Sequence, residues 1–226
     1  MHALAQRFPN VVIPSFGYHP WYVRERSAEW QRTLLGFLDK TPSAVGEIGL
    51  DRWIKDYNIE DQEGVFIWQL RLAAERNLPV SIHCLQAWGK MFDLLRGESR
   101  PRCGFLLHSY GGPMEMVKPL AELGAYFSLP GYFAHERKSR QREVFRHVPL
   151  ERLLIETDAP DQPLPPERVL YQCNDSKSGE PFNHPANLPA VYQFAAELVH
   201  IPLDQLIPRV EANFQLLFGP LLSARN

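Results

Sequence analysis

The sequence of 226 residues is poor in cysteine and has no long apolar run. Its cysteines, Cys84, Cys103 and Cys173, are odd in number and match no metal-binding spacing, which favours reduced thiols over a disulfide framework. No apolar stretch approaches the ~20 residues of a membrane span. The opening MHALAQRFPN lacks the charged and apolar regions of a signal peptide. We therefore expect a cytoplasmic protein that does not enter a membrane.

The chain also lacks an excess of positive charge. It has 24 Lys and Arg against 26 Asp and Glu, which excludes attraction of nucleic acid by the overall field but not by a local patch. At 45% hydrophobic residues, the chain is too apolar to be disordered. Its length suits one α/β barrel or one doubly wound sheet, so we expect a single domain over residues 1–226.

Short apolar runs alternate with segments of helical length. Most of these runs lack strict polar alternation, which is typical of parallel strands covered on both faces. The expected strands are Val11–Phe16, Ser43–Ile48, Leu78–His83, Cys103–His108, Ala125–Leu129 and Leu153–Thr157. Strands alternating with helices predict a parallel βαβ succession.

Helices are expected over residues 28–39, 60–77 and 113–124, the last with a kink at Pro119, and two more within residues 186–218. The first strand begins so early that little room is left for an element before it. Six strands are fewer than the eight of a (β/α)8 barrel. An open sheet and a barrel without its first units both stay open at this point.

Residues of metal-ligand type stand at the ends of four expected strands: Glu47, His83, His108 and Asp158. The carboxyl ends of parallel barrel strands open on one face, so these side chains should converge. Imidazole and carboxylate groups bind Zn²⁺, Mn²⁺, Fe²⁺ or Mg²⁺. A carboxylate can also bridge two metals ~3.5–4 Å apart, an arrangement suited to hydrolysis of phosphate esters. The pattern predicts a metal-dependent hydrolase in which Asp158 accepts a proton from water.

Several short motifs carry a family resemblance. They are GYHP at 17–20, GEIGLD at 46–51, IHC at 82–84, HSYGG at 108–112, ETDAP at 156–160 and NHPANLPAV at 183–191. In this order, from about Leu4 to Phe218, they resemble the signature blocks of the TatD family. Members of that family are metal-dependent deoxyribonucleases with a TIM-barrel fold in the amidohydrolase superfamily.

The resemblance implies a role for each motif residue. Glu47 matches the carboxylate that bridges two metals, His83 and His108 match ligands of the second metal, and Asp158 matches a ligand of the first metal that handles the water proton. His19 matches a pocket residue that contacts substrate. The implied cofactors are up to two divalent ions, Mg²⁺, Mn²⁺ or Zn²⁺. The implied substrate is DNA, cut from single-stranded 3′ ends.

The sequence also departs from the family pattern. The HxH motif of the first barrel strand is absent, since His2 stands alone, which leaves Glu47 and Asp158 for the first metal. Leu85–Gln86 stand where many members have Arg-Asp, and His184 replaces a glutamate. We therefore expect an N-terminally truncated (β/α)8 barrel without its first one or two βα units. Either the chain starts inside a longer natural one or its activity is impaired.

Further residues are candidates for substrate contacts. Lys138 and Arg140 lie in a basic cluster that also holds Arg137, Arg142 and Arg146; they could grip phosphates or form a solvated helix face. A second group, the aromatic residues that follow strand ends, could stack on unpaired bases or pack in the core: Trp21, Trp53, Trp88, Tyr110 and Tyr132.

Asp51 and Glu156 are expected to support the metal ligands rather than to bind metal. Two other functions stay open. One is an amidohydrolase acting on a small C–N or ester substrate, and the other is a truncated, catalytically impaired remnant with a binding role.

Overall fold

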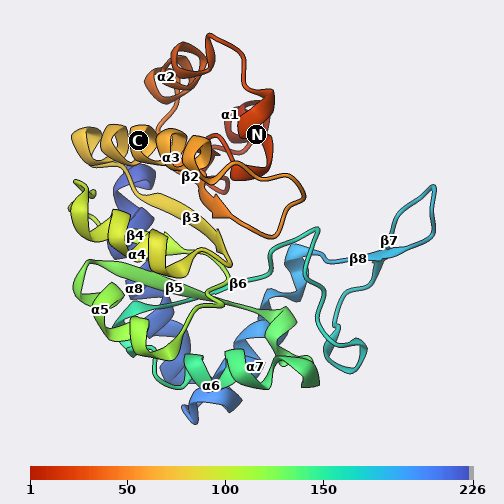
Figure 1. Ribbon diagram of the computed structural model, residues 1–226. Coiled ribbons are helices and arrows are strands. Elements are labelled where there is room, and N and C mark those ends of the chain that lie inside the picture. The colour runs from red at the N-terminus through yellow and green to blue at the C-terminus, as the bar shows by residue number, and fades with distance from the viewer. Residues whose placement is uncertain (224–226) are drawn as a thin grey trace. The chain divides into compact units, whose positions relative to one another are not determined.

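The computed structural model describes residues 1–223, which form two compact units (Figure 1). Unit 1 holds residues 1–108 and 122–125 and the described residues from Phe214 onward. Unit 2 holds residues 109–121 and 126–213. Each unit is described by itself.

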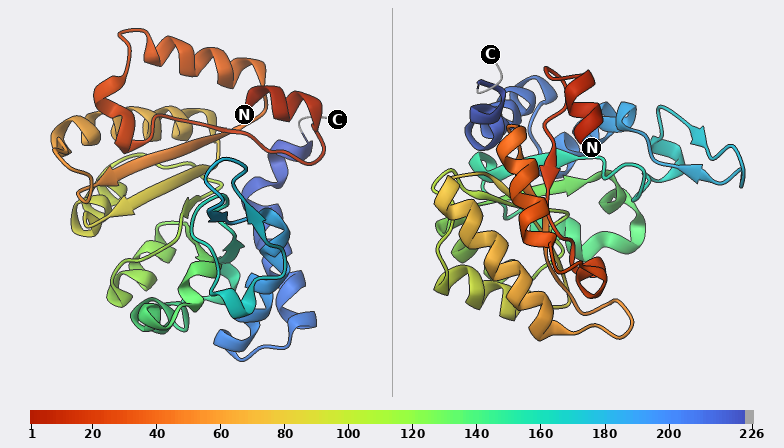
Figure 2. Two further views of the ribbon diagram at one scale, coloured as in Figure 1. Left: turned by 90° about the vertical axis from the view of Figure 1, so that its right-hand side faces the viewer. Right: turned by 90° about the horizontal axis from the view of Figure 1, so that it is seen from above.

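Unit 1 is built on parallel strands in the order β1 (Ser15–Phe16), β2 (Ala44–Asp51), β3 (Val80–Leu85) and β4 (Phe105–Leu107). The long strands β2 and β3 run side by side (Figure 2). The helical segments of this unit are α1 (His2–Arg7), η1 (Pro20–Glu25), α2 (Trp30–Lys40), α3 (Ile59–Arg76) and α4 (Trp88–Gly97).

The core of unit 1 lies between its strands and helix α3. Val45, Ile48 and Leu50 of β2 are completely buried, as are Phe66 and Leu70 of α3. Consecutive strand residues point to opposite faces, so burial of both Leu50 and Asp51 shows that β2 is covered on both sides there. Helix α3 ends where Asn77 adopts a left-handed backbone, close to the predicted end.

Unit 2 holds most of β5 (Ala125–Pro130) and β6 (Leu153–Glu156), which pair in parallel. Its helical segments are η2 (Met114–Met116), α5 (Val117–Glu122), η3 (Gly131–Ala134), η4 (Glu136–Lys138), α6 (Ser139–Phe145), η5 (Leu150–Arg152), η6 (Pro166–Arg168), η7 (Pro185–Asn187), α7 (Leu188–Val199) and the first part of α8 (Leu203–Ser223). The short strands β7 (Cys173–Asn174) and β8 (Pro181–Phe182) form a hairpin. Within residues 1–223, no helix combines the length and apolarity needed to cross a bilayer.

The α/β class is confirmed, and each of the six predicted strands overlaps one of β1 to β6. The expectation that little precedes the first strand is wrong, because residues 2–7 form helix α1. The first strand is also much shorter than predicted. The amides of Val11 and Val12 bond to the carbonyl of Phe8, and Pro14 has no amide hydrogen to give to a strand.

The helix predicted over residues 113–124 is divided into η2 and α5. Helix α5 begins at Val117, so Pro119 lies in its first turn. Amides in the first turn have no partner within the helix, so proline costs nothing there. The two predicted C-terminal helices are confirmed as α7 and α8.

Candidate metal centre

A β-bulge in the pairing of β2 with β3 includes Glu47. The pairing runs from Val45 opposite Val80 to Ile48 opposite Ile82, so β2 carries one extra residue over this stretch. Such a bulge re-aims the side chains within it. Two residues on, Gly49 lies opposite His83, and a Cβ at Gly49 would stand 1.8 Å from the His83 carbonyl oxygen. Glycine is therefore required for the close approach of the two strands that carry Glu47 and His83.

The carboxylate of Glu47 faces three histidines of unit 1. Its Oε2 lies 3.5 Å from His19 Nε2 and 3.9 Å from His83 Nδ1. Its Oε1 lies 3.6 Å from His108 Nε2. The two oxygens thus face different imidazoles, an arrangement that a bridging or ligating carboxylate needs.

Glu47 is ionised in this setting. Burial raises the pKa of its carboxyl, but the hydrogen bond from His19 and the charges of His108 and His83 outweigh burial and lower that pKa to about 2. A metal binds a carboxylate in its deprotonated form, so no proton has to be displaced at neutral pH.

Asp51 determines which nitrogen of His83 is available. It is completely buried and accepts hydrogen bonds from His83 Nε2 at 2.8 Å and Trp21 Nε1 at 2.7 Å. Burial raises the pKa of Asp51, but the hydrogen bonds lower it by more, so the net pKa is below its usual value. The group is therefore a carboxylate, which can only accept hydrogen bonds. His83 Nε2 therefore carries a hydrogen, and in the neutral form of the ring the Nδ1 on the side of Glu47 has the lone pair. Metal-binding histidines are commonly oriented by a carboxylate in this way, and the supporting role of Asp51 stays a prediction.

In His19 it is a hydrogen, not a lone pair, that faces Glu47. Its Nδ1 accepts a hydrogen bond from the backbone amide of Trp21 at 3.2 Å, as the N-cap of η1. In the neutral ring Nε2 then carries the hydrogen and points it at Glu47. One ligand-type atom from each of His19, Glu47 and His83 lies within 4.8 Å of the others, but a protonated nitrogen cannot coordinate. His19 is a hydrogen-bond donor here, and the ligand candidates of unit 1 are Glu47, His83 and His108.

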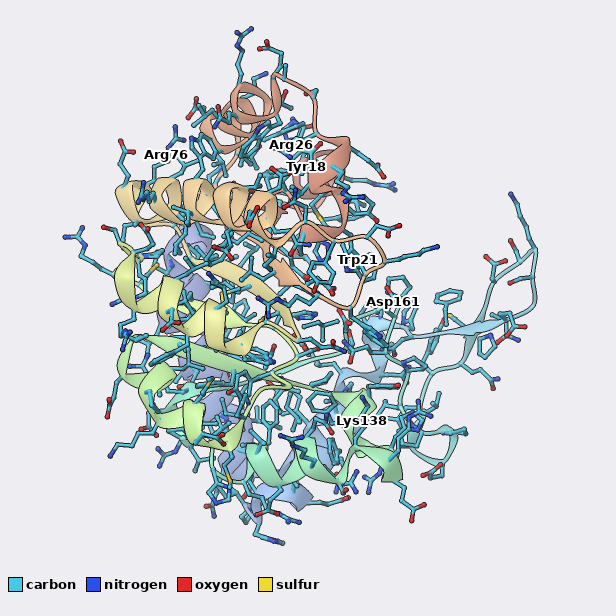
Figure 3. All side chains as sticks on the ribbon, viewed as in Figure 1. Tyr18, Trp21, Arg26, Arg76, Lys138 and Asp161 are labelled. Atoms are coloured by element: carbon cyan, nitrogen blue, oxygen red, sulfur yellow. The ribbon has the colours of Figure 1, made fainter. Side chains whose placement is uncertain are left out.

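Two glutamines of α3 hold the segments that carry these groups. Gln62 accepts from the amide of Asp51 at 2.8 Å and donates to its carbonyl at 3.0 Å. Gln69 accepts from the amide of Tyr18 at 2.6 Å and donates to its carbonyl at 3.2 Å, next to His19. Figure 3 labels Tyr18 beside this helix. Sequence reasoning missed both glutamines; the available signal was two polar residues on the otherwise apolar, buried stripe of α3.

In unit 2, Glu156 and Asp158 belong to one hydrogen-bond network. Glu156 Oε1 accepts from the amide of Ser109 at 3.0 Å and from its hydroxyl at 2.5 Å. Gln162 Nε2 donates to Ser109 Oγ at 3.0 Å and also to Asp158 Oδ2. Asp158 has a left-handed backbone with φ of 59°, which aspartate tolerates better than most residues. The network links Glu156 to Asp158 through Ser109 and Gln162, and the supporting role of Glu156 and the metal-binding and proton-accepting roles of Asp158 stay predictions.

Asn183 fixes the loop that contains Asp158. It is 3% exposed, and its Nδ2 donates to the carbonyl oxygens of Thr157 at 2.6 Å and Asp161 at 2.9 Å. Asp161 is labelled in Figure 3. In the sequence this asparagine stood out as part of a motif, but nothing local indicated that it would close a loop some 25 residues away.

The other predicted substrate contacts differ in their surroundings. Tyr110 is completely buried and its hydroxyl donates to the carbonyl of Pro113 at 2.8 Å, which favours a packing role over contact with substrate. Lys138, labelled in Figure 3, places Nζ 4.8 Å from the centre of the Tyr132 ring, and Arg140 is exposed. Arg142 instead donates to the carbonyl of Phe133 at 2.9 Å, so the basic cluster divides into structural and solvent-facing members.

The chain matches one protein family over almost its whole length. The family described as TatD related DNase matches residues 1–219. The metal-dependent hydrolase YjjV of Escherichia coli K12, described as uncharacterized, is 31% identical over 220 residues, covering 96% of this chain and 80% of that protein. The 3′-5′ ssDNA/RNA exonuclease TatD of Erwinia amylovora is 33% identical over 227 residues, covering 96% and 82%.

Solved structures give the same result. The crystal structure of YjjV, a TatD homologue from Escherichia coli K12, superposes with a TM-score of 0.83 at 29% identity, covering 96% of this chain and 80% of that one. The family match spans almost all of the described residues, and the predicted resemblance is confirmed. The chain belongs to the family of TatD-related deoxyribonucleases.

Proposed function

We propose that this protein is a metal-dependent deoxyribonuclease that removes nucleotides from single-stranded 3′ ends. The observation that carries the proposal is the ionised Glu47 facing His83 Nδ1 and His108 Nε2, with the His83 tautomer set by Asp51. Membership of the TatD-related family supports the substrate class, and relatives are named single-stranded DNA/RNA exonucleases.

The donor set of unit 1 suits a divalent cation. Two imidazole nitrogens and a carboxylate fit Zn²⁺ or Mn²⁺ well, and Mg²⁺ less well because Mg²⁺ prefers oxygen ligands. Glu47 is ionised, and the bond from His83 Nε2 to Asp51 leaves Nδ1 of the neutral imidazole to bind the cation. When bound, the cation supplies Lewis acidity toward the phosphodiester and makes water a stronger nucleophile.

The protein's own residues have three tasks in this proposal. His19 offers an Nε2 hydrogen beside Glu47, where it can donate to a phosphate oxygen. Asp158 accepts the proton of the attacking water. Lys138 and Arg140 hold the phosphates of the strand, which a protein with a net charge of −2 has to bind through a local patch.

The test is hydrolysis of a 5′-labelled single-stranded oligonucleotide with Mg²⁺, Mn²⁺ or Zn²⁺, read as a ladder that shortens from the 3′ end. Glu47→Ala and Asp158→Asn should each abolish the ladder while the thermal unfolding midpoint is kept. Glu63→Ala is the matched control, since Glu63 is an acid of unit 1 that pairs with Lys90 at 3.3 Å.

Two outcomes would contradict the proposal. Full activity of Asp158→Asn would remove its role as proton acceptor. An inactive wild-type protein that nevertheless binds metal through Glu47 would show that the substrate is not DNA, and cyclic amides and small esters would then be the substrates to try.

A further inference from the structure

Exposed aromatic side chains gather next to the metal centre of unit 1. They come from η1 and from the loop that follows β2, and they comprise Trp21 (51% exposed), Tyr22 (52%), Trp53 (72%) and Tyr57 (43%). Large apolar side chains cost free energy when they face water, so four of them on two adjacent segments indicate a contact surface. We refer to these four residues as the aromatic rim. Figure 3 shows Trp21 on the side of unit 1 where the loop after β2 projects.

Positive charges are interspersed with the aromatic rim. A small hollow of about 60 Å³ is lined by Trp21 and Tyr57 together with Arg24 and Lys55, and the carboxylates of Asp56 and Asp61 line it as well. Both of these cationic side chains are exposed, as is Arg52 at the start of the same loop. Aromatic rings alternating with Arg and Lys form the surface by which proteins bind single-stranded nucleic acid, with bases on the rings and phosphates on the cations.

The rim is fixed to the metal centre by one carboxylate. Asp51 Oδ2 accepts from the indole Nε1 of Trp21 at 2.7 Å, and Asp51 Oδ1 accepts from the backbone amide of Trp53 at 2.6 Å. The Trp21 ring centre lies 5.1 Å from that of His19 and 6.2 Å from that of His83. The Trp21 ring is therefore held in place before any ligand arrives, which reduces the entropy lost on binding.

We propose that the aromatic rim is a base-stacking subsite for the unpaired nucleobases next to the phosphodiester that is cut. Trp21 carries the base nearest the metal centre, and Trp53 and Tyr57 carry its neighbours. The inference rests on the proposed nuclease function and explains a preference for single strands, because paired bases do not expose their faces to the rim. A partner protein fits less well as the occupant, because Asp51, which holds the aromatic rim, also bonds to the candidate metal ligand His83.

The test measures binding in the presence of EDTA, so that no strand is cut. Fluorescence anisotropy gives the Kd for a labelled oligothymidylate and for an abasic strand of the same length and charge. Trp53→Ala keeps the backbone amide that bonds to Asp51 and removes only the exposed indole. It should weaken binding of oligothymidylate about tenfold and leave the abasic strand unchanged. Phe8→Ala, which removes a ring 43% exposed after helix α1, is the matched control.

Each result is decisive. The inference is overturned if wild-type protein binds both strands equally, or if Trp53→Ala weakens both or neither. Tyr57→Ala repeats the test should Trp53→Ala lower the unfolding midpoint. Base-dependent binding without hydrolysis on adding metal would refute the proposed nuclease but leave the subsite standing, whereas hydrolysis without base dependence would refute the subsite alone.

Discussion

Replacing Asp51 with asparagine should weaken metal binding about 10- to 100-fold although Asp51 is not itself a ligand. The substitution keeps the shape of the side chain and exchanges one acceptor oxygen for an NH₂ group. In the native protein both oxygens accept, from His83 and Trp21 on one side and from the Trp53 amide on the other. Asparagine has a single acceptor oxygen, so it can accept hydrogen bonds from only one of these two sides.

The expected magnitude follows from the histidine tautomer. If the asparagine oxygen stays with the Trp53 amide, its NH₂ group faces His83 Nε2, which then has to accept rather than donate. The hydrogen of His83 moves to Nδ1, the nitrogen that faces Glu47, and this nitrogen can no longer coordinate. Restoring the productive tautomer costs roughly 1.4–2.7 kcal/mol, which is the same 10- to 100-fold change in Kd.

Isothermal titration of metal-free protein with Zn²⁺ or Mn²⁺ measures this change directly. Asp61→Asn is the control, because Asp61 is an acid of unit 1 that pairs with Arg26 at 2.6 Å and does not touch a histidine. It should change stability without changing metal affinity. Wild-type affinity in Asp51→Asn would refute the assignment of His83 Nδ1 as the ligand atom.

Three further predictions concern the packing around the centre. Asn183→Ala removes the donor of the Thr157 and Asp161 carbonyls, so the free energy of unfolding should fall by about 1 kcal/mol in denaturant titration, and nuclease activity should fall with the loop that carries Asp158. Gly49→Ala forces a Cβ against the carbonyl of His83, so it should destabilise the protein by about 3 kcal/mol or prevent folding; a normal unfolding midpoint would contradict the close approach. Cys84 is 4% exposed and burial raises the pKa of its thiol, so a thiol reagent at mildly alkaline pH should label it far more slowly than the two half-buried cysteines.

The candidate ligands could be picked out from the sequence because parallel strands place their carboxyl ends together. Of the three in unit 1, only His108 directly follows its strand, whereas β2 and β3 run on to Asp51 and Leu85, so Glu47 and His83 lie within their strands. The family motifs then supplied the likely chemistry.

What could not be predicted depends on contacts between distant segments. The bulge that re-aims Glu47 is a property of the pairing between β2 and β3, and no residue of β2 alone specifies it. The hydrogen positions on His19 and His83 follow from Trp21 and Asp51, which are neighbours in space but not in sequence. Helix α1 was missed because a segment of six residues has too weak a periodicity to be distinguished from the start of a strand.

The two hydrogen bonds between the side chain of Gln62 and the backbone of Asp51 also bear on how such a protein can diverge in sequence. Because the glutamine holds both backbone groups of Asp51, the candidate ligand His83 that bonds to Asp51 can keep its position when side chains change in the loop that begins at Arg52. Mutations in that loop can therefore accumulate and be selected for new substrates without cost to the chemical step. Helix α3 thus fixes the backbone of Asp51, whereas the side chains of the adjacent loop remain free to change.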